Sequence, residues 1–365
     1  MSSDAWLRLL SAAALGGTRW LIALRNAGSV DALLAMKPSS LRRAGLRSTE
    51  IAHLKLQSGP PPPSWCAWLE QPNHELVVYG SDHYPERLTE TDDAPLALWI
   101  DGPDKALLGY PQFAIVGSRH PTHNGLITAE SFANKLSEAG ITIASGLARG
   151  IDAASHRGAL GGAGKTIAVL GNGIDQIYPH GNRKLACEIR EQGLIVSEYG
   201  PTTPVRAHQF PRRNRIIASL SLGTLVVEAT RRSGSLITAR LAAECGREVF
   251  AVPGSIHSAL SKGCHKLIRD GAKLVENIDD ILVEIAPQLR AATQESAHQV
   301  AANGNREMPR ILADCLDFSP MTLDSLISAT GLTAAKLSSM LLHLEIQGKI
   351  EALPGGRYCR LVKRG

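Results

Sequence analysis

The sequence of 365 residues has few aromatic side chains and no closely spaced cysteines. Aromatic residues make up 4% of the chain although hydrophobic residues make up 44%. The six cysteines form neither a CxxC pair nor a Cys/His cluster at zinc spacing, which excludes a disulfide scaffold and a structural zinc site. No apolar run approaches the ~20 residues of a membrane span, and the N-terminus lacks the basic region of a signal peptide. We therefore expect a cytoplasmic protein with no membrane segment.

Two segments of unusual composition predict the domain boundaries. Gly59 is followed by four prolines, which fix φ and donate no hydrogen bond, so we expect a stiff linker there. Residues 287–305 are rich in Ala, Gln and Asn and read as a flexible tether. The predicted domains are a helical domain at 1–58, a Pro-rich linker and lead-in at 59–95, an α/β domain at 96–286, the tether at 287–305 and a last domain at 306–365.

The middle domain repeats one pattern seven times: a short apolar run, a glycine-rich loop and an amphipathic helix. Apolar runs without polar alternation indicate parallel strands buried on both faces. This predicts an α/β fold with an extended Rossmann-like, doubly wound and mainly parallel sheet, whose ligands bind beyond the carboxyl ends of the strands. The predicted strands are 113–116, 141–144, 166–170, 194–197, 224–227, 248–252 and 273–275.

The two flanking domains have helical patterns. In the first, apolar residues recur at helical spacing on both sides of Gly16 and Gly17, which predicts a small bundle. That glycine break weakly suggests a helix-hairpin-helix motif that holds a DNA phosphate. We favour the alternative, in which this domain serves for packing or docking. In the last domain, helices at 309–316, from Thr322 and from Thr333 precede a turn at 354–356 between two β-like runs, which predicts a winged helix.

Two near-matches to nucleotide motifs are rejected from their context. Gly164-Lys165-Thr166 lacks the first glycine of a phosphate-binding loop and leads into a strand instead of a helix. Gly171-Asn172-Gly173 has Gln176 where a dinucleotide fingerprint requires glycine. We therefore expect neither ATP nor NAD, and no cofactor or metal.

Positive charge is concentrated in one segment. Residues 206–247 contain eight arginines and two acids, a net charge of +6 that exceeds the chain total of +5 and leaves the remainder near neutral at −1. Four of these arginines fall in 206–215, which we expect to be a loop at the strand-end edge. Arginine binds phosphate bidentately and stacks on bases. A solvated arginine face paired with acids elsewhere is the alternative.

Three strand-end turns add groups suited to phosphates. Gly117-Ser118-Arg119, Ser145-Gly146 and Ser233-Gly234-Ser235 follow the first, second and fifth strands, the last at a predicted helix N-terminus. Phe210 lies among the arginines and either plugs the core or stacks on a base. Together these turns predict a track for successive phosphates.

Several long motifs, in order, closely resemble the DNA-processing protein A family (DprA or Smf). They are Val116 to Arg119, Ser145 to Asp152, Tyr178-Pro179 with Asn182, Phe210 to Ile217, and Ser233 to Ala239. The resemblance covers about residues 96–282. It implies a Rossmann-like domain that binds single-stranded DNA and forms a homodimer, flanked by a sterile-alpha-motif-type domain and a winged helix. It also implies protection of incoming strands in natural transformation and loading of RecA recombinase on them.

The resemblance places Arg119 on a phosphate, with the other motif residues around it. His180 stands where several members have lysine, so a fixed positive charge there is in doubt. No catalytic residue is expected. The DNA-binding residues implied are Gly117, Ser118, Arg119, Ser145, Gly146, His180, Asn182, Phe210, Arg212, Arg213, Asn214, Arg215, Ser233, Gly234 and Ser235.

Two other functions are weighed. LOG-type nucleotide phosphoribohydrolases use a PGGxGTxxE loop on a similar sheet, and residues 221–228 keep Gly-Thr and Glu228 but lack Pro-Gly-Gly. We prefer Glu228 as an orienting partner for Arg231, Arg232 or another loop arginine, since no second carboxylate or nucleophile–base pair is placed by motif. A winged-helix transcription regulator would rely on Lys336, His343 and Arg357, which is little charge for a DNA groove.

Overall fold

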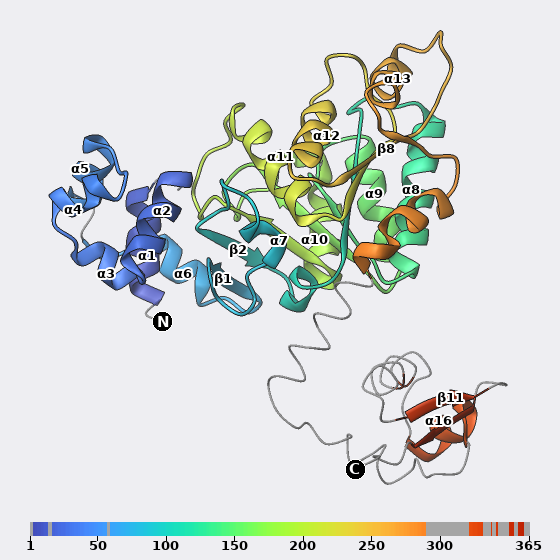
Figure 1. Cartoon of the computed structure of the whole chain (residues 1–365), viewed down its shortest axis with the longest axis horizontal. Coiled ribbons are helices and arrows are strands. Elements are labelled where there is room, and N and C mark those ends of the chain that lie inside the picture. The colour runs from blue at the N-terminus through green and yellow to red at the C-terminus, as the bar shows by residue number, and fades with distance from the viewer. Residues whose placement is uncertain are drawn as a thin grey trace. The chain divides into compact units, whose positions relative to one another are not determined.

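The computed structural model describes residues 3–13, 17–56, 59–289, 321–330, 337, 341, 350–353 and 357–360. The chain divides into two compact units, residues 1–286 and 287–365 (Figure 1). The boundary between the units falls at the first residue of the predicted tether. The tether itself lies almost wholly outside the described residues.

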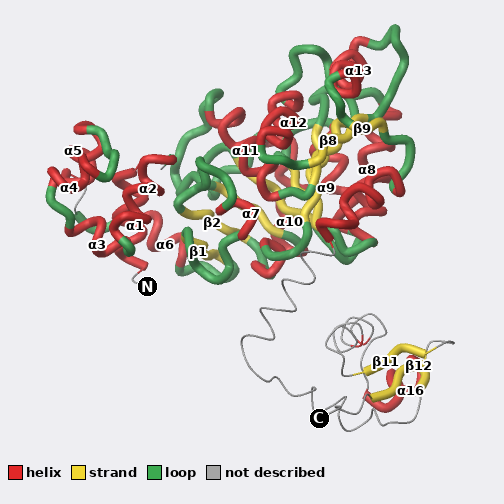
Figure 2. Tube along the Cα trace, viewed as in Figure 1, coloured by secondary structure: helices red, strands yellow, loops and turns green. Residues whose placement is uncertain are grey.

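A nine-stranded sheet forms the centre of the first unit. Its strands are yellow in Figure 2, and their order is β1-β2-β6-β5-β4-β3-β7-β8-β9. Strands β3 to β9 pair in parallel, and each of them begins and ends within one residue of a predicted strand. The predicted fold class is confirmed. These strands are β3 (Gln112–Val116), β4 (Thr142–Ser145), β5 (Thr166–Leu170), β6 (Leu194–Ser197), β7 (Gly223–Val226), β8 (Glu248–Ala251) and β9 (Lys273–Leu274).

Residues 59–111, which span the predicted lead-in (59–95) and the start of the predicted α/β domain, are folded and add two strands that the sequence analysis missed. β1 (His74–Val78) and β2 (Ala97–Asp101) extend the sheet antiparallel beside β6. Of the four prolines expected in a stiff linker, Pro60 to Pro62 lie outside helices and strands, and Pro63 begins helix α6 (Pro63–Leu69), where its missing N–H costs nothing. Helix α7 (Glu86–Thr89) and the 3-10 turn η1 (Lys105–Leu108) complete this segment.

Helices cover both faces of the sheet because successive strand residues point to opposite faces. Ile167 and Val169 of β5 pack with α11 (Gln209–Leu220), in a cluster that also includes α12 (Ser235–Glu244) and α13 (Lys262–Arg269). Ala168 and Leu170 pack in a cluster with α9 (Ile151–Leu160) and α10 (Arg183–Gln192). The remaining elements are α8 (His123–Glu138), which packs on α9, and the 3-10 turns η2 (His180–Asn182) and η3 (Ala259–Ser261).

The N-terminal helices share a core with the sheet. Trp6, Trp20 and Leu41 are buried in a cluster that continues through Val78 of β1 and through Leu96, which directly precedes β2. The helical domain predicted at 1–58 is therefore part of the first unit and not a separate body. Its helices are α1 (Ser3–Ala13), α2 (Thr18–Ala27), α3 (Val30–Ala35), α4 (Pro38–Arg43) and α5 (Ser48–Leu56).

The second unit contains a three-stranded sheet, β10-β12-β11, and one described helix. Thr322 caps this helix as predicted, since its Oγ1 accepts a hydrogen bond from the Ser325 amide at 3.2 Å. The predicted helix at 309–316 and the turn at 354–356 lie outside the described residues, as does most of the helix predicted from Thr333. The elements are β10 (Met321–Thr322), α16 (Leu323–Thr330), β11 (Ile350–Leu353) and β12 (Arg357–Arg360).

Candidate nucleic-acid interface

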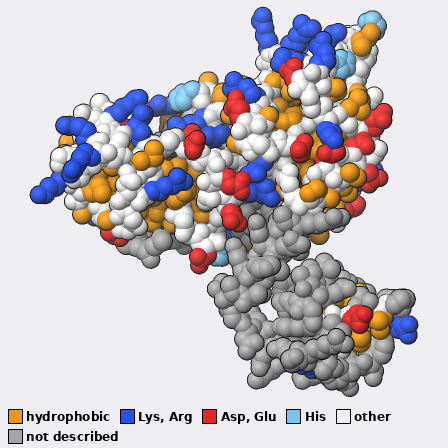
Figure 3. Space-filling view, viewed as in Figure 1, with side chains coloured by type: hydrophobic (Ala, Val, Ile, Leu, Met, Phe, Trp, Pro, Cys, Tyr) orange, Lys and Arg blue, Asp and Glu red, His pale blue; other side chains and the backbone are white. Residues whose placement is uncertain are grey.

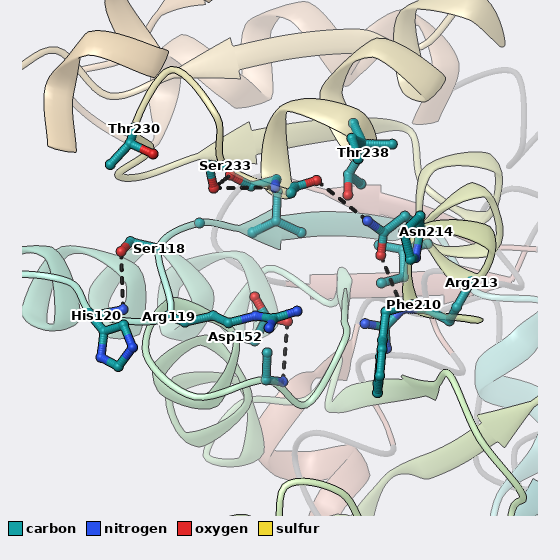
Figure 4. A pocket seen from close by; sticks show the side chains of 18 of the residues that line it. Ser118, Arg119, His120, Asp152, Phe210, Arg213, Asn214, Thr230, Ser233 and Thr238 are labelled. Carbon is teal, nitrogen blue, oxygen red and sulfur yellow. Dashed lines mark hydrogen bonds between the residues drawn. The ribbon is translucent and has the colours of Figure 1, made fainter. Parts of the chain in front are cut away.

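A pocket of about 480 Å³ opens at the carboxyl ends of β3 and β7, where the doubly wound fold places ligands (Figure 4). The loop after β3 forms one wall, and the N-termini of α11 and α12 form the others. Nine of the fifteen predicted DNA-binding residues line it: Gly117, Ser118, Arg119, Phe210, Arg213, Asn214, Ser233, Gly234 and Ser235.

Arg119 is the exposed cation of this pocket. Its guanidinium extends over the pocket toward Asp152 (Figure 4) and has no ion-pair partner within 4 Å in the described part of the chain. The backbone amides of Ser118 and Arg119 likewise donate no hydrogen bond to described residues. A guanidinium beside unoccupied amides can hold a phosphate oxygen without displacing another group.

The N-terminus of α12 faces Arg119 from across the pocket (Figure 4). The Ser233 and Ser235 hydroxyls lie 2.7 Å apart, and the Gly234 carbonyl accepts a hydrogen bond from Asn214 at 3.5 Å. The Gly234 amide has no acceptor among the described residues. This helix end, with its partial positive charge and hydroxyl groups, is suited to an anion.

The predicted Ser145-Gly146 contact is not available to a ligand. Ser145 is fully buried and its hydroxyl donates to the Ile115 carbonyl at 2.7 Å. The Gly146 amide donates to the Asp152 carboxylate at 3.1 Å, and the Ala148 amide donates to the same oxygen at 3.3 Å. Neither residue of the turn lines the pocket. The turn instead positions Asp152. Burial raises the pKa of this carboxyl group, and the Arg213 guanidinium offsets part of that rise.

Arg213 is a structural residue at the base of the pocket. It is buried, and one guanidinium nitrogen donates to the Gly146 carbonyl at 2.8 Å and to the Val169 carbonyl. Burial lowers its pKa to about 10, so it stays charged at neutral pH. A Cβ at Gly146 would lie 2.4 Å from this guanidinium, which explains the glycine. The predicted DNA contact of Arg213 is therefore replaced by contacts to two strand ends.

The arginine segment is helical and partly neutralised, contrary to the predicted loop. Helix α11 begins at Gln209, so three of the four arginines in 206–215 lie on its first turns. Arg215 pairs with Glu198 at 2.5 Å and with Asp93 at 3.1 Å, and Arg212 lies 3.6 Å from Glu198. Neither Arg212 nor Arg215 lines the pocket. For these two residues the structure shows the alternative weighed from the sequence, pairing with acids elsewhere in the chain.

Aromatic rings form the edge of the pocket next to α11. Phe210 is half-buried and lies 5.6 Å from the exposed Tyr178 ring, which in turn lies 6.4 Å from the exposed His180. Tyr178 and His180 also line an adjacent groove of about 640 Å³. Asn182 is not free, since its amide donates to the Leu147 carbonyl at 2.9 Å. The edge thus offers rings for stacking, and Asn182 holds the loop beneath them.

Glu228 has a different partner from the one predicted. Its carboxylate accepts hydrogen bonds from the Thr122 amide at 2.9 Å and from the Thr122 hydroxyl at 2.6 Å. Thr122 is the N-cap of α8 and accepts from the Gly125 amide at 3.0 Å. The carboxylate therefore caps α8 and does not orient Arg231 or Arg232.

Sequence reasoning missed several lining residues. His120, Asp152, Thr230 and Thr238 belong to the pocket. Asp152 and Thr238 stand inside motifs that were quoted for the resemblance, and they were passed over because neither belongs to a strand-end glycine turn. Among the described residues, no group of His, Cys, Asp and Glu could hold a metal ion, and no helix is long and apolar enough to cross a membrane.

Comparisons with known proteins agree on one family. A family model described as DNA recombination-mediator protein A matches residues 75–286, and a DprA winged helix domain model matches residues 295–356. Protein Smf of Escherichia coli is 39% identical, over 99% of this chain and 96% of that protein. The DNA processing protein DprA of Streptococcus pneumoniae is 50% identical, over 56% of this chain and 71% of that protein.

Two solved structures are also similar. DprA from Streptococcus pneumoniae aligns with a TM-score of 0.69 and 38% identity, covering 78% of this chain and 99% of that one. DNA processing protein A from Helicobacter pylori, whose structure is described as revealing its single-stranded DNA binding mode, aligns with a TM-score of 0.53 and 30% identity, covering 59% and 97%.

Proposed function

Since the chain belongs to the DNA-processing protein A (DprA/Smf) family, we propose that it binds single-stranded DNA in the pocket at the carboxyl ends of β3 and β7. The observation that carries this proposal is the exposed Arg119 guanidinium, which faces the N-terminus of α12 across the pocket. The Helicobacter pylori relative is described as binding single-stranded DNA, which supports the same ligand class here.

The pocket chemistry favours the phosphate backbone over the bases. A phosphate accepts hydrogen bonds from Arg119, from the Ser118 and Arg119 amides and from the Gly234 amide, none of which has another acceptor in the described residues. A neighbouring base stacks on Phe210 or Tyr178. Because every base has a π-face and every nucleotide a phosphate, binding is expected to be independent of sequence.

The wider role proposed here rests on the family. The protein protects incoming single strands in natural transformation, loads RecA recombinase on them, acts in the cytoplasm and forms a homodimer through its Rossmann-like domain. We propose a non-catalytic role, in which bound DNA is held and handed over rather than cut. The capping role of Glu228 supports this, because the carboxylate that a phosphoribohydrolase would use is bonded to Thr122.

Arg119→Ala tests the pocket. One charge-assisted hydrogen bond to phosphate is lost, so affinity for a single-stranded oligonucleotide should fall by about tenfold or more. The slope of log affinity against log salt should become shallower by about 0.7, the share of one phosphate of a single strand. Fluorescence anisotropy at two salt concentrations measures both.

Arg157→Ala is the matched control, since Arg157 is exposed in the last turn of α9, at the opposite edge of the sheet. It should bind like the wild type. A folded Arg119→Ala variant with unchanged affinity and slope would contradict the proposed site, and absence of binding by the wild type would overturn the function itself.

A further inference from the structure

The N-terminal helices carry the whole net charge of the protein. Residues 1–58 contain eight Lys and Arg against three Asp and Glu, a net charge of +5, and the rest of the chain contains 31 of each sign. Two of the three acids are paired within the module, Asp4 with Arg8 and Glu50 with Arg19. Figure 3 shows Lys and Arg side chains spread over these helices, at the left of the view. The charge is therefore exposed and largely uncompensated.

The cations concentrate on α4 (Pro38–Arg43) and on the residues that flank it. Residues 32–49 contain no acid and four cations, Lys37, Arg42, Arg43 and Arg47. All four are exposed, and none forms an ion pair within 4 Å in the described part of the chain. We call them the α4 basic surface. Three of the four are arginines, whose planar fork suits phosphate oxygens.

The fold fixes these side chains outward. Helix α4 ends in a Schellman motif, in which the Leu46 amide bonds to the Leu41 carbonyl at 3.1 Å and the Gly45 amide bonds to the Arg42 carbonyl at 3.1 Å. Gly45 has a φ of +98°, which favours glycine. Leu41 and Leu46 are buried in the module core, so the intervening arginines face the solvent. The turn at the end of α4 thus sets the directions of Arg42 and Arg43 relative to the buried leucines.

The basic surface belongs to the same compact unit as the DNA pocket. The N-terminal helices share a buried cluster with Val78 of β1 and with Leu96, which directly precedes β2. The Arg25 guanidinium also donates to the Tyr79 hydroxyl at 2.6 Å, across the junction. Two cationic sites on one unit are suited to one polyanionic strand, because the second contact costs less once the first is made.

We propose that the α4 basic surface is a second contact site for the phosphate backbone of DNA, which lengthens the footprint of the strand held in the pocket. This inference rests on the proposed function for the identity of the ligand. The site is electrostatic and reads no sequence, since no exposed ring lies among the four cations.

The test compares two double variants of the full chain. Arg42→Glu with Arg47→Glu reverses the α4 basic surface. Lys135→Glu with Arg157→Glu is the matched control, because both residues lie in last helical turns at the opposite edge of the sheet from the pocket. Each is titrated by anisotropy with an oligo-dT of about 6 nucleotides, enough for one site, and of about 40 nucleotides, which at about 3.4 Å per phosphate exceeds the span of the unit.

The Arg42/Arg47 variant should bind the long oligonucleotide about tenfold more weakly and with a salt slope shallower by about 1.4, while its affinity for the short one stays at the wild-type value. The control variant should match the wild type with both oligonucleotides.

Equal affinity of the Arg42/Arg47 variant and the wild type for the long strand would overturn the inference and leave the pocket intact. An equal loss with both lengths would overturn it too, since that indicates a general defect. Binding of anionic phospholipid vesicles that needs these arginines, with DNA binding unaffected, would assign the surface to membranes instead.

Failure of the proposed function gives a different result. In that case the wild-type protein binds neither oligonucleotide and Arg119→Ala changes nothing. Arg42→Ala with Arg47→Ala is the second variant, because it removes charge without introducing acids and should show a smaller loss of the same kind. Circular dichroism of every variant checks that the helices remain folded.

Discussion

At the scale of single residues, the pocket rests on ionisable side chains that are buried and bonded. His156 is fully buried, and its Nε2 accepts a hydrogen bond from the Leu147 amide at 3.3 Å. Its Nδ1 lies 2.7 Å from the Thr166 hydroxyl, which donates to the Ile143 carbonyl, so Nδ1 carries the proton. Burial, with Arg213 and Arg157 nearby, lowers the pKa of His156 to about 3. The neutral ring thereby fixes the loop after β4.

This residue predicts how stability depends on pH. The folded pKa of His156 is about 3 and the unfolded value is 6.5, so its contribution to stability is full above pH 6.5 and is lost as the pH falls from 6.5 toward 3. At pH 5 the loss from this group should reach about 2 kcal/mol. His156→Gln keeps one acceptor and one donor but does not titrate. Urea unfolding at pH 7 and pH 5 should therefore show a smaller pH effect for the variant. An equal pH effect in both proteins would contradict the assignment.

Individual residues also mark the limit of what the sequence could predict. Arg119 and the Ser233 to Ser235 turn were found from their place after strands. The resemblance implied DNA contacts for Arg212 and Arg215, and the count of charges in the segment agreed, but neither shows which acids these arginines pair with. Glu198 lies in another loop and Asp93 in the lead-in, and only the folded sheet brings them to α11.

At the scale of elements, parallel strands were predictable and the start of α11 was not. A strand buried on both faces leaves an unbroken apolar run, which is a strong pattern. β1 is an antiparallel strand in the short lead-in after a proline run, and β2, at the start of the predicted α/β domain, is not followed by the glycine-rich loop and helix that marked the other strands. Residues 206–215 were expected to be a loop, yet α11 begins at Gln209, and Pro211 is accommodated in its first turn, where its missing N–H would be unpaired in any case.

The cap of α8 gives a prediction for an element. Glu228 and Thr122 together satisfy the amides at the N-terminus of this 16-residue helix. Glu228→Ala should lower the free energy of unfolding by about 1–2 kcal/mol, because the Thr122 amide loses its acceptor. Glu228→Gln keeps an acceptor oxygen and should lose less. Urea midpoints of the two variants measure this, and equal midpoints for Glu228→Ala and the wild type would show that the cap is dispensable.

At the scale of the whole molecule, the charge distribution is the feature that the sequence analysis read incompletely. The +6 of residues 206–247 left a remainder of −1, which suggested a single basic edge on a near-neutral protein. The net charge of −1 outside residues 206–247 combines regions of opposite charge, because the N-terminal helices alone carry +5. Ion pairs with Glu198 and Asp93 further reduce the charge on α11, whereas the α4 cations keep theirs. The second basic surface became apparent only once the fold showed which cations are exposed.

The domain plan predicts opposite results for two truncations. The boundary at 286 separates compact units, so removal of residues 287–365 should leave the thermal unfolding midpoint of the first unit and its DNA affinity unchanged.

Removal of residues 1–58 takes away the helices that bury Val78, Leu96 and Ala97, and exposes an apolar patch beside β2. That truncated protein should unfold at a lower temperature and bind the hydrophobic dye ANS, because burial of this patch no longer contributes about 25 cal/mol per Å² of apolar area. Circular dichroism melts and dye fluorescence of both truncations measure the difference. A chain beginning at residue 59 that melts at the wild-type temperature without dye binding would show that the N-terminal helices fold as an independent domain after all.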